Sequence, residues 1–206
     1  GATVLQRVED LYRPFMQKRR TRATMAKEKG LEPLANLLLT FSSATPEELA
    51  QPFVNVENEV ETVEDALAGA RDIIAENFAD DAKIRETIRK IAWADGSIVS
   101  TVRKGAVDER KVFGNYYEYD EPLKRIVPHR TLALNRGEKE DVLRISISFP
   151  EERIIGGMER ELIHKGHSPS AIQVRDAIQD SFKRLIAPSI EREIRSDLTE
   201  KAEEQA

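Results

Sequence analysis

The chain has 206 residues, of which 40% are hydrophobic and 33% charged, and its formal net charge at pH 7 is −5. This length and balance are typical of one large or two small globular domains. The chain has no cysteine, which excludes disulfide bonds and thiolate metal sites and is typical of a reducing cytoplasm, where we expect this protein. No apolar run approaches the ~18 residues of a membrane span, so we expect no membrane partner.

Residues 3–54 are predicted to form an N-terminal helical region. An amphipathic pattern covers residues 3–16, and a short helix follows that Thr21 can cap and Gly30 can end. Residues 45–48 read Thr-Pro-Glu-Glu, which is a capping box with proline at the first helical position. This part of the chain therefore contains several short helices joined by tight turns.

A dense group of cations lies within this helical region, although the chain as a whole is acidic. An anionic partner such as RNA or DNA would explain it, because Lys and Arg neutralise phosphates. Ion pairing with acids elsewhere in the fold would also explain it, since most charged runs are solvated faces. The candidate nucleic-acid-binding residues are Lys18, Arg19, Arg20, Arg22 and Lys27.

Residues 62–104 are predicted to form a helix-turn-helix-like unit, which an acidic linker at residues 55–61 separates from the first region. Two amphipathic helices flank an acidic turn, Gly96 ends the second, and a β-branched strand follows at residues 98–102. This order is typical of a helix-turn-helix with a small wing. It is also typical of a plain helical hairpin, and the sequence leaves both interpretations open.

Residues 105–206 are predicted to be a helical region with one or two short strands. Four aromatic residues within 112–119 favour a buried helical stripe over a base-stacking surface. Residues 142–149 alternate with period two and predict a strand that could pair with 98–102. Pro188 should kink or divide a long C-terminal helix. The fold class is therefore mainly α, an irregular array of helices with a minor β element.

The sequence offers no catalytic constellation. Its histidines are His129, His164 and His167, and the last two flank Gly166 near an expected helix end, so a shared metal-facing surface is not expected. No phosphate-binding glycine loop of the GxxxxGK[ST] type occurs. We therefore expect no enzyme activity, no metal and no cofactor.

Four stretches together identify a family resemblance. They are EDLYRPFMQKRRTRATMAKEKGLEPLA at residues 9–35, TVEDALAGARDIIAE at 62–76, EPLKRIVPHRTLALNRGEKEDVL at 121–143 and DSFKRLIAPSIEREIRSDLTEKAEEQA at 180–206. In this order they resemble the helical region of the Tex family of bacterial transcription accessory proteins, ahead of its RNase-H-like domain. The resemblance implies a fragment of a multi-domain, non-catalytic nucleic-acid-binding factor.

Two functions follow as hypotheses. In the first, the chain binds RNA or DNA through its basic residues and acts in transcription or RNA metabolism, with the transcription machinery as a further partner. In the second, it is a helical scaffold that braces the remaining domains of the same chain. The apolar line Ile190, Ile194, Leu198 and Ala202 would support the scaffold if it were exposed.

Overall fold

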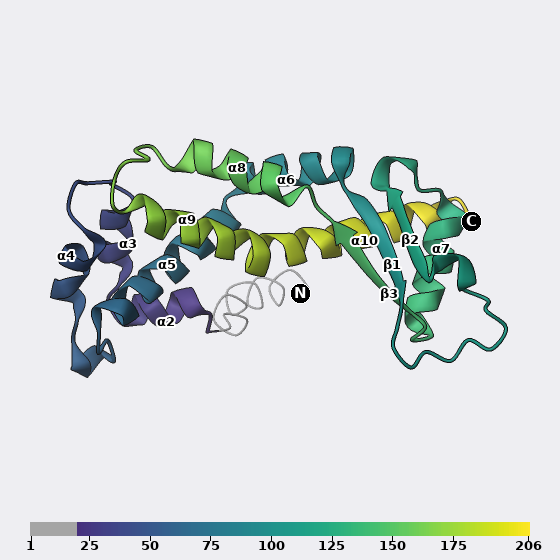
Figure 1. Cartoon of the computed structure of the whole chain (residues 1–206), viewed down its shortest axis with the longest axis horizontal. Helices are drawn as coiled ribbons and strands as arrows, with labels where there is room; N and C mark the ends of the chain where they lie inside the picture. Colours follow the sequence, from purple (N-terminus) through teal and green to yellow (C-terminus); the bar gives the residue numbers. More distant parts are fainter. Residues whose placement is uncertain (1–19) are drawn as a thin grey trace, which may run out of the picture. The chain divides into compact units, whose positions relative to one another are not determined.

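A computed structural model describes residues 20–206, which are mainly helical with one small antiparallel sheet (Figure 1). This confirms the predicted fold class. The helix expected at residues 3–16 lies outside the described residues. The chain divides into two compact units, one formed by the residues up to Glu76 with Lys165–Ala177, the other by Asn77–His164 with Ile178–Ala206. Each unit thus joins segments that are distant in sequence.

Unit 1 is built from short helices and parts of two longer ones. Its elements are α2 (Arg22–Glu28), α3 (Glu32–Leu38), α4 (Pro46–Ala50), the 3-10 turns η1 (Gln51–Phe53) and η2 (Val56–Asn58), most of α5 (Val63–Asp80) and the start of α9 (Ala171–Asp180). The predicted capping box is present, because Thr45 Oγ1 accepts from Glu48 N–H and the Glu48 carboxylate accepts from Thr45 N–H. Leu31, Leu34 and Leu38 are buried with the apolar face of α5.

Unit 2 combines the remaining helices with the sheet. Its elements are α6 (Ala82–Asp95), β1 (Ser97–Val102), η3 (Gly114–Tyr116), β2 (Glu118–Pro122), η4 (Leu123–Arg125), α7 (Pro128–Lys139), β3 (Leu143–Ser148), α8 (Glu151–Leu162), the π-helical η5 (Ser181–Ile186) and α10 (Ala187–Glu204). Asp81 caps α6, since its carboxylate accepts from Ile84 N–H at 2.9 Å.

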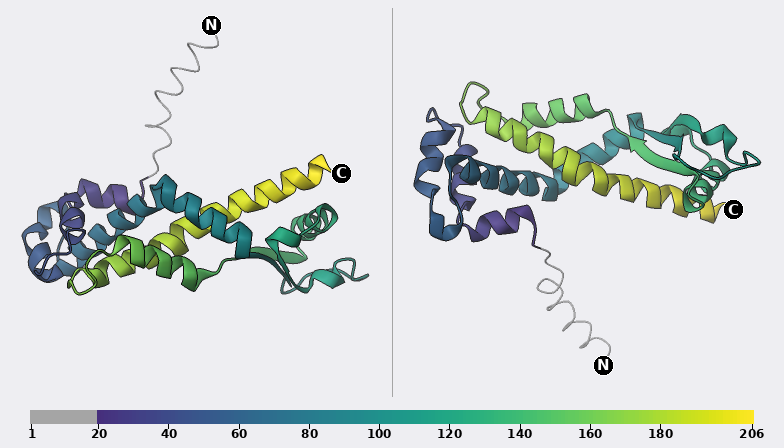
Figure 2. Two further views of the ribbon diagram at one scale, coloured as in Figure 1. Left: turned by 90° about the horizontal axis from the view of Figure 1, so that it is seen from above. Right: turned by 60° about the horizontal axis from the view of Figure 1, so that its bottom comes forward.

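The sheet has the order β2-β1-β3, with both pairs antiparallel (Figure 1; Figure 2 gives two further views). The two predicted strands therefore do pair, and Ile98 of β1 lies opposite Ile147 of β3. Side chains on β3 alternate between buried and exposed, so one face of the sheet belongs to the core. Helix α7 packs against β3 on this face, where Gly137 allows close approach to Leu143.

Helix α10 joins the sheet, α6 and α7 into one unit. Its apolar line is buried, with Ile190 and Ile194 both 0% exposed. Glu191 accepts from Ile147 N–H at the edge of β3, Glu193 pairs with Arg85 and Arg89 of α6, and Arg195 pairs with Glu138 of α7. Because this line is buried within unit 2, it gives no support to the scaffold hypothesis.

Two parts of the C-terminal region differ from the sequence expectations. The aromatic run does not form an α-helix, because only the 3-10 turn η3 lies within it and the backbone of Tyr119 already pairs with Ser100 of β1. Helical spacing was a misleading signal in so short a segment. Pro188 does not divide the long C-terminal helix, because α10 begins at Ala187 and continues to Glu204, whereas a kink at this proline stays a prediction. A π-helical segment precedes this proline, and Ala187 N–H reaches back to Phe182 O, five residues earlier.

Candidate nucleic-acid interface

The described part of the basic segment begins at Arg20 and continues along α2, whereas Lys18 and Arg19 lie outside the described residues. Helix α2 begins where predicted, because Thr21 and Thr24 form reciprocal hydrogen bonds that satisfy free N–H groups of the first turn. It ends before Gly30, whose φ of 79° is in the left-handed region. The buried side of this helix consists of Ala23 and Ala26.

Arg20, Arg22 and Lys27 all have exposed side chains. Arg20 donates to Glu28 at 2.6 Å, but both side chains lie in solvent, with 70% and 58% of their surfaces exposed. An ion pair of this kind contributes about 0–1 kcal/mol. Arg20 could therefore exchange Glu28 for a phosphate at little cost.

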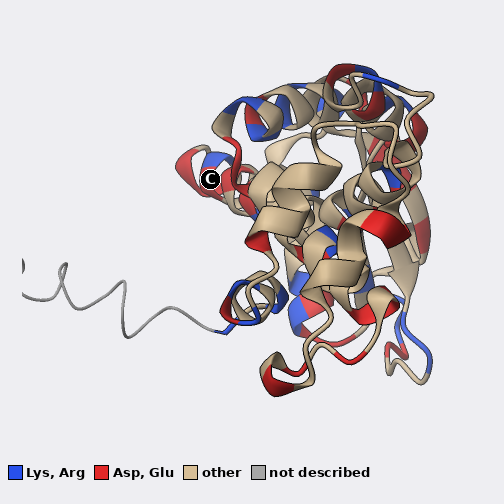
Figure 3. Cartoon of the chain, turned by 90° about the vertical axis from the view of Figure 1, so that its left-hand side faces the viewer, with Lys and Arg blue, Asp and Glu red and all other residues tan. Residues whose placement is uncertain are grey.

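The cations of α2 and its C-terminal end differ in their surroundings. Arg22 and Lys29, together with Met25, line a cleft of about 380 Å³ in unit 1, whereas Lys27 does not line it. Acidic residues line the same cleft, namely Glu59, Asp65 and Asp72. Figure 3 shows acidic and basic positions interspersed on the helices of this unit. With three acids against two cations, the cleft itself is not an anion site.

The aromatic run contacts other residues of unit 2 rather than forming a stacking platform. Phe113 is buried, and Tyr116 lies edge-on to Tyr119 with ring centroids 5.1 Å apart. Tyr117 donates its hydroxyl hydrogen to Asp108 at 2.8 Å. These rings therefore stabilise the region around β2.

A buried polar network is the main feature that the sequence did not reveal. The carboxylate of Glu121 is largely buried and accepts from the Tyr119 hydroxyl and from Arg130 of α7. Burial and the hydrogen bond to Glu121 raise the pKa of Tyr119 to about 12. The alternation Tyr-Asp-Glu at residues 119–121 places the first and third side chains on one face of a strand, which is the signal that could have indicated the pair. The network connects β2 to α7.

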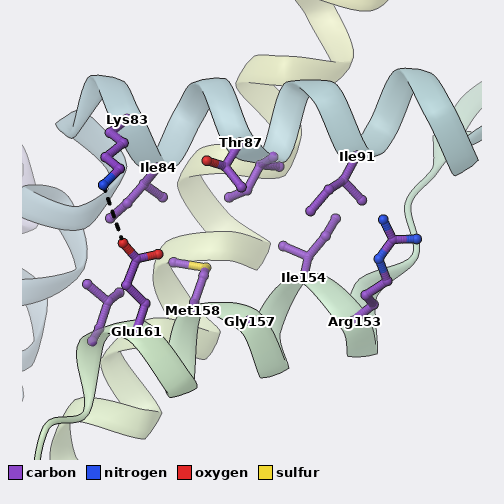
Figure 4. A pocket seen from close by; sticks show the side chains of 11 residues that line it. Lys83, Ile84, Thr87, Ile91, Arg153, Ile154, Gly157, Met158 and Glu161 are labelled. Carbon is purple, nitrogen blue, oxygen red and sulfur yellow. Dashed lines mark ion pairs between the residues drawn. The ribbon is translucent and has the colours of Figure 1, made fainter.

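A small apolar groove lies between α6 and α8 (Figure 4). Ile84, Ile88, Ile154 and Met158 line it, and Lys83 reaches Glu161 across one end at 3.9 Å. Its volume of about 140 Å³ is below the ~300 Å³ at which small-molecule sites begin, and few polar groups converge on it. We interpret it as a packing seam between two helices.

The histidines do not form a metal site in the structure. His129, His164 and His167 are exposed, and no group of three His, Cys, Asp or Glu residues between residues 20 and 206 could hold a metal ion. No helix in the described part of the chain is long and apolar enough to cross a membrane.

Comparison with known proteins gives a consistent result. Residues 42–206 match a family model described as Tex central region-like. The chain is 49% identical to YdcI of Bacillus subtilis over 98% of its own length, and 36% identical to the protein tex of Bordetella pertussis over 84%. It is 35% identical over 97% of its length to the transcriptional accessory protein Tex of Neisseria gonorrhoeae. These matches span 28%, 21% and 27% of the three relatives, about a quarter of their length.

Proposed function

Because the chain belongs to the Tex family, we propose that it is a non-catalytic module of a cytoplasmic transcription accessory factor and that its basic segment binds RNA or DNA. The observation that carries this proposal is the exposure of Arg20, Arg22 and Lys27 next to Lys18 and Arg19 in the sequence. The gonococcal relative is named a transcriptional accessory protein, which supports a nucleic-acid partner. The transcription machinery and the remaining domains of the same protein would be its other partners.

The proposed mechanism is neutralisation of phosphates. Lys and Arg side chains on a short helix and its preceding turn can contact a backbone without reading bases. Each contact releases condensed counterions, so the affinity should fall steeply with salt and depend little on sequence. Such a surface would position an RNA or DNA strand for domains that lie elsewhere in the protein.

The test is binding of fluorescent single-stranded RNA, single-stranded DNA and duplex DNA across a salt series. The triple variant Lys18→Glu, Arg19→Glu and Arg20→Glu should weaken binding for every sequence alike. It should also reduce the slope of log affinity against log salt by about 2 for single strands, at about 0.7 per phosphate contact. A matched control reverses three exposed cations elsewhere, Lys124, Arg125 and Lys165. Equal binding by the two triple variants would contradict the assignment.

The scaffold function remains the second candidate, and one observation favours it. The cleft beside α2 has more acids than cations, as expected if the cations of unit 1 pair with acids rather than with phosphates. Under this alternative the wild-type chain would bind none of the three nucleic acids, even at low salt.

A further inference from the structure

Residues 103–112 are the first part of the connection between β1 and β2 and form two tight turns in unit 2. In the first turn, Ala106 N–H donates to Arg103 O at 3.1 Å, and Gly105 adopts a φ of 79°. In the second, Lys111 N–H donates to Asp108 O at 3.0 Å. Val107 joins the two turns and is 80% exposed, so the tip of this loop lies in solvent.

The loop is held at both ends. Arg103 N–H donates to Val142 O at 2.8 Å, which fixes the first turn to the start of β3. The Asp108 carboxylate accepts from Val112 N–H, Phe113 N–H and the Tyr117 hydroxyl at 2.8 to 3.0 Å. Although reduced hydration alone raises the pKa of Asp108, these three hydrogen bonds lower it, so the carboxylate stays ionised and bonded at neutral pH.

Each turn presents two exposed cations, Arg103 with Lys104 and Arg110 with Lys111. Arg103 has an exposed partner in Asp141 at 3.3 Å, whereas the other three have no ion pair among the described residues. The acids of the loop are Asp108, whose oxygens already accept three hydrogen bonds, and Glu109. The loop is therefore a positive projection with a net charge of +2 in a chain of net charge −5.

We propose that residues 103–112 form a second contact for nucleic-acid phosphates, separate from the basic segment at α2. The inference rests on the proposed function, since it assigns a further surface to the same ligand. A projection that is already folded loses little conformational freedom on binding, and paired cations on successive turns can neutralise neighbouring phosphates. Because these cations would contact phosphates and not base edges, this contact should be independent of sequence.

The test uses the full 206-residue chain and the same fluorescent RNA and DNA probes. The double variant Lys104→Glu and Arg110→Glu changes one cation in each turn and leaves Asp108 and its hydrogen bonds intact. The matched control is Lys124→Glu with Arg125→Glu, two exposed cations that follow β2 at the opposite end of the sheet. Circular dichroism should first establish whether both variants are folded.

We expect the loop variant to weaken binding several-fold and to reduce the single-strand salt slope by about 1.4, at about 0.7 per lost contact. The control should change both values less. A measurement on the wild-type chain is independent of any folding defect: trypsin cleaves after Lys and Arg, so saturating RNA or DNA should protect the sites in residues 103–111 more than those at Lys124 and Arg125. Equal protection, or equal affinity of the loop and control variants, overturns the inference while the α2 assignment stands.

Two other outcomes also overturn it. If the wild-type chain binds no RNA or DNA at low salt, the inference fails together with the proposed function. If the loop variant loses binding to vesicles of anionic phospholipid but not to the oligonucleotides, the cations recognise a lipid surface instead.

Discussion

Replacing one glycine of α7 should destabilise the protein, although alanine is the better helix former. A Cβ at position 137 would lie 2.7 Å from Leu143 Cγ and 3.2 Å from Phe113 Cδ1, and closer still to Leu143 Cδ1. The favourable distance between carbon atoms is about 3.5–4.0 Å. Leu143 is 0% exposed and belongs to β3, so it has no free space into which to move.

The expected magnitude is the difference between two effects. Gly137→Ala gains about 0.5–1 kcal/mol from reduced chain entropy and loses about 1–3 kcal/mol through overpacking. The net destabilisation should be about 0.5–2 kcal/mol. Gly156→Ala in α8 is the matched control, because its nearest contact is the flexible end of Arg160 at 3.4 Å. There only the gain remains, and the variant should be about 0.5–1 kcal/mol more stable.

Urea unfolding followed by far-ultraviolet circular dichroism measures both variants against the wild type. Both glycines belong to unit 2, so both variants measure the stability of the same unit even if the two units unfold separately. If Gly137→Ala is as stable as the wild type, Leu143 relaxes and the close packing of α7 on β3 is not fixed. If Gly156→Ala is also destabilising, the helix-propensity part of the reasoning is wrong.

Three further predictions concern α10 and the buried network. The hydrogen bond from Arg89 lowers the pKa of Glu193 despite partial burial. The ionised carboxylate therefore stabilises the fold above the ordinary carboxyl pKa, and this contribution is lost as the pH falls through the lowered pKa. Glu193→Gln should cost less than about 1 kcal/mol of unfolding free energy at pH 7, and in acid the variant and the wild type should be equally stable. Tyr119 holds its proton in the folded state to about pH 12, so stability should fall as the pH rises from about 10, and Tyr119→Phe should remove the latest tyrosinate absorbance step. Ile194→Ala removes a side chain that is 0% exposed and should cost about 2–5 kcal/mol in urea unfolding, whereas a cost near zero would contradict its burial.

Local signals in the sequence were sufficient to predict most helices and two of the three strands. The capping boxes at Thr21 and Thr45 depend on residues three positions apart, so they can be recognised without knowledge of the fold. Strand β3 could likewise be predicted locally, because its apolar and polar residues alternate. The helix-turn-helix interpretation of residues 62–104 stays a prediction, and so does the nucleic-acid role of the basic residues.

The features that sequence reasoning missed depend on contacts between distant segments. Strand β2 is short and contains Asp120 and Pro122, both poor strand formers, and it exists because β1 provides its hydrogen bonds. The pairing of Glu121 with Arg130 becomes visible only when β2 lies beside α7. The division of the basic residues of α2 into a cleft-lining group and a separate Lys27 also required the positions of Glu59 and Asp65.

The π-helical segment before Pro188 makes the C-terminal part of unit 2 sensitive to the number of residues in it. Buried residues recur every fourth position from Ile178 through Ile186 to Ala202, a spacing wider than the 3.6 residues of an α-turn. Between Ser181 and Ile186 the wider turn of η5 accommodates this spacing, because its hydrogen bonds reach back five residues. Deleting one residue there would turn α10 by about 100° relative to Ile178 and move its apolar line out of its buried position. This stretch of chain is therefore constrained in its number of residues as well as in its buried side chains, among them Phe182 and Ile186.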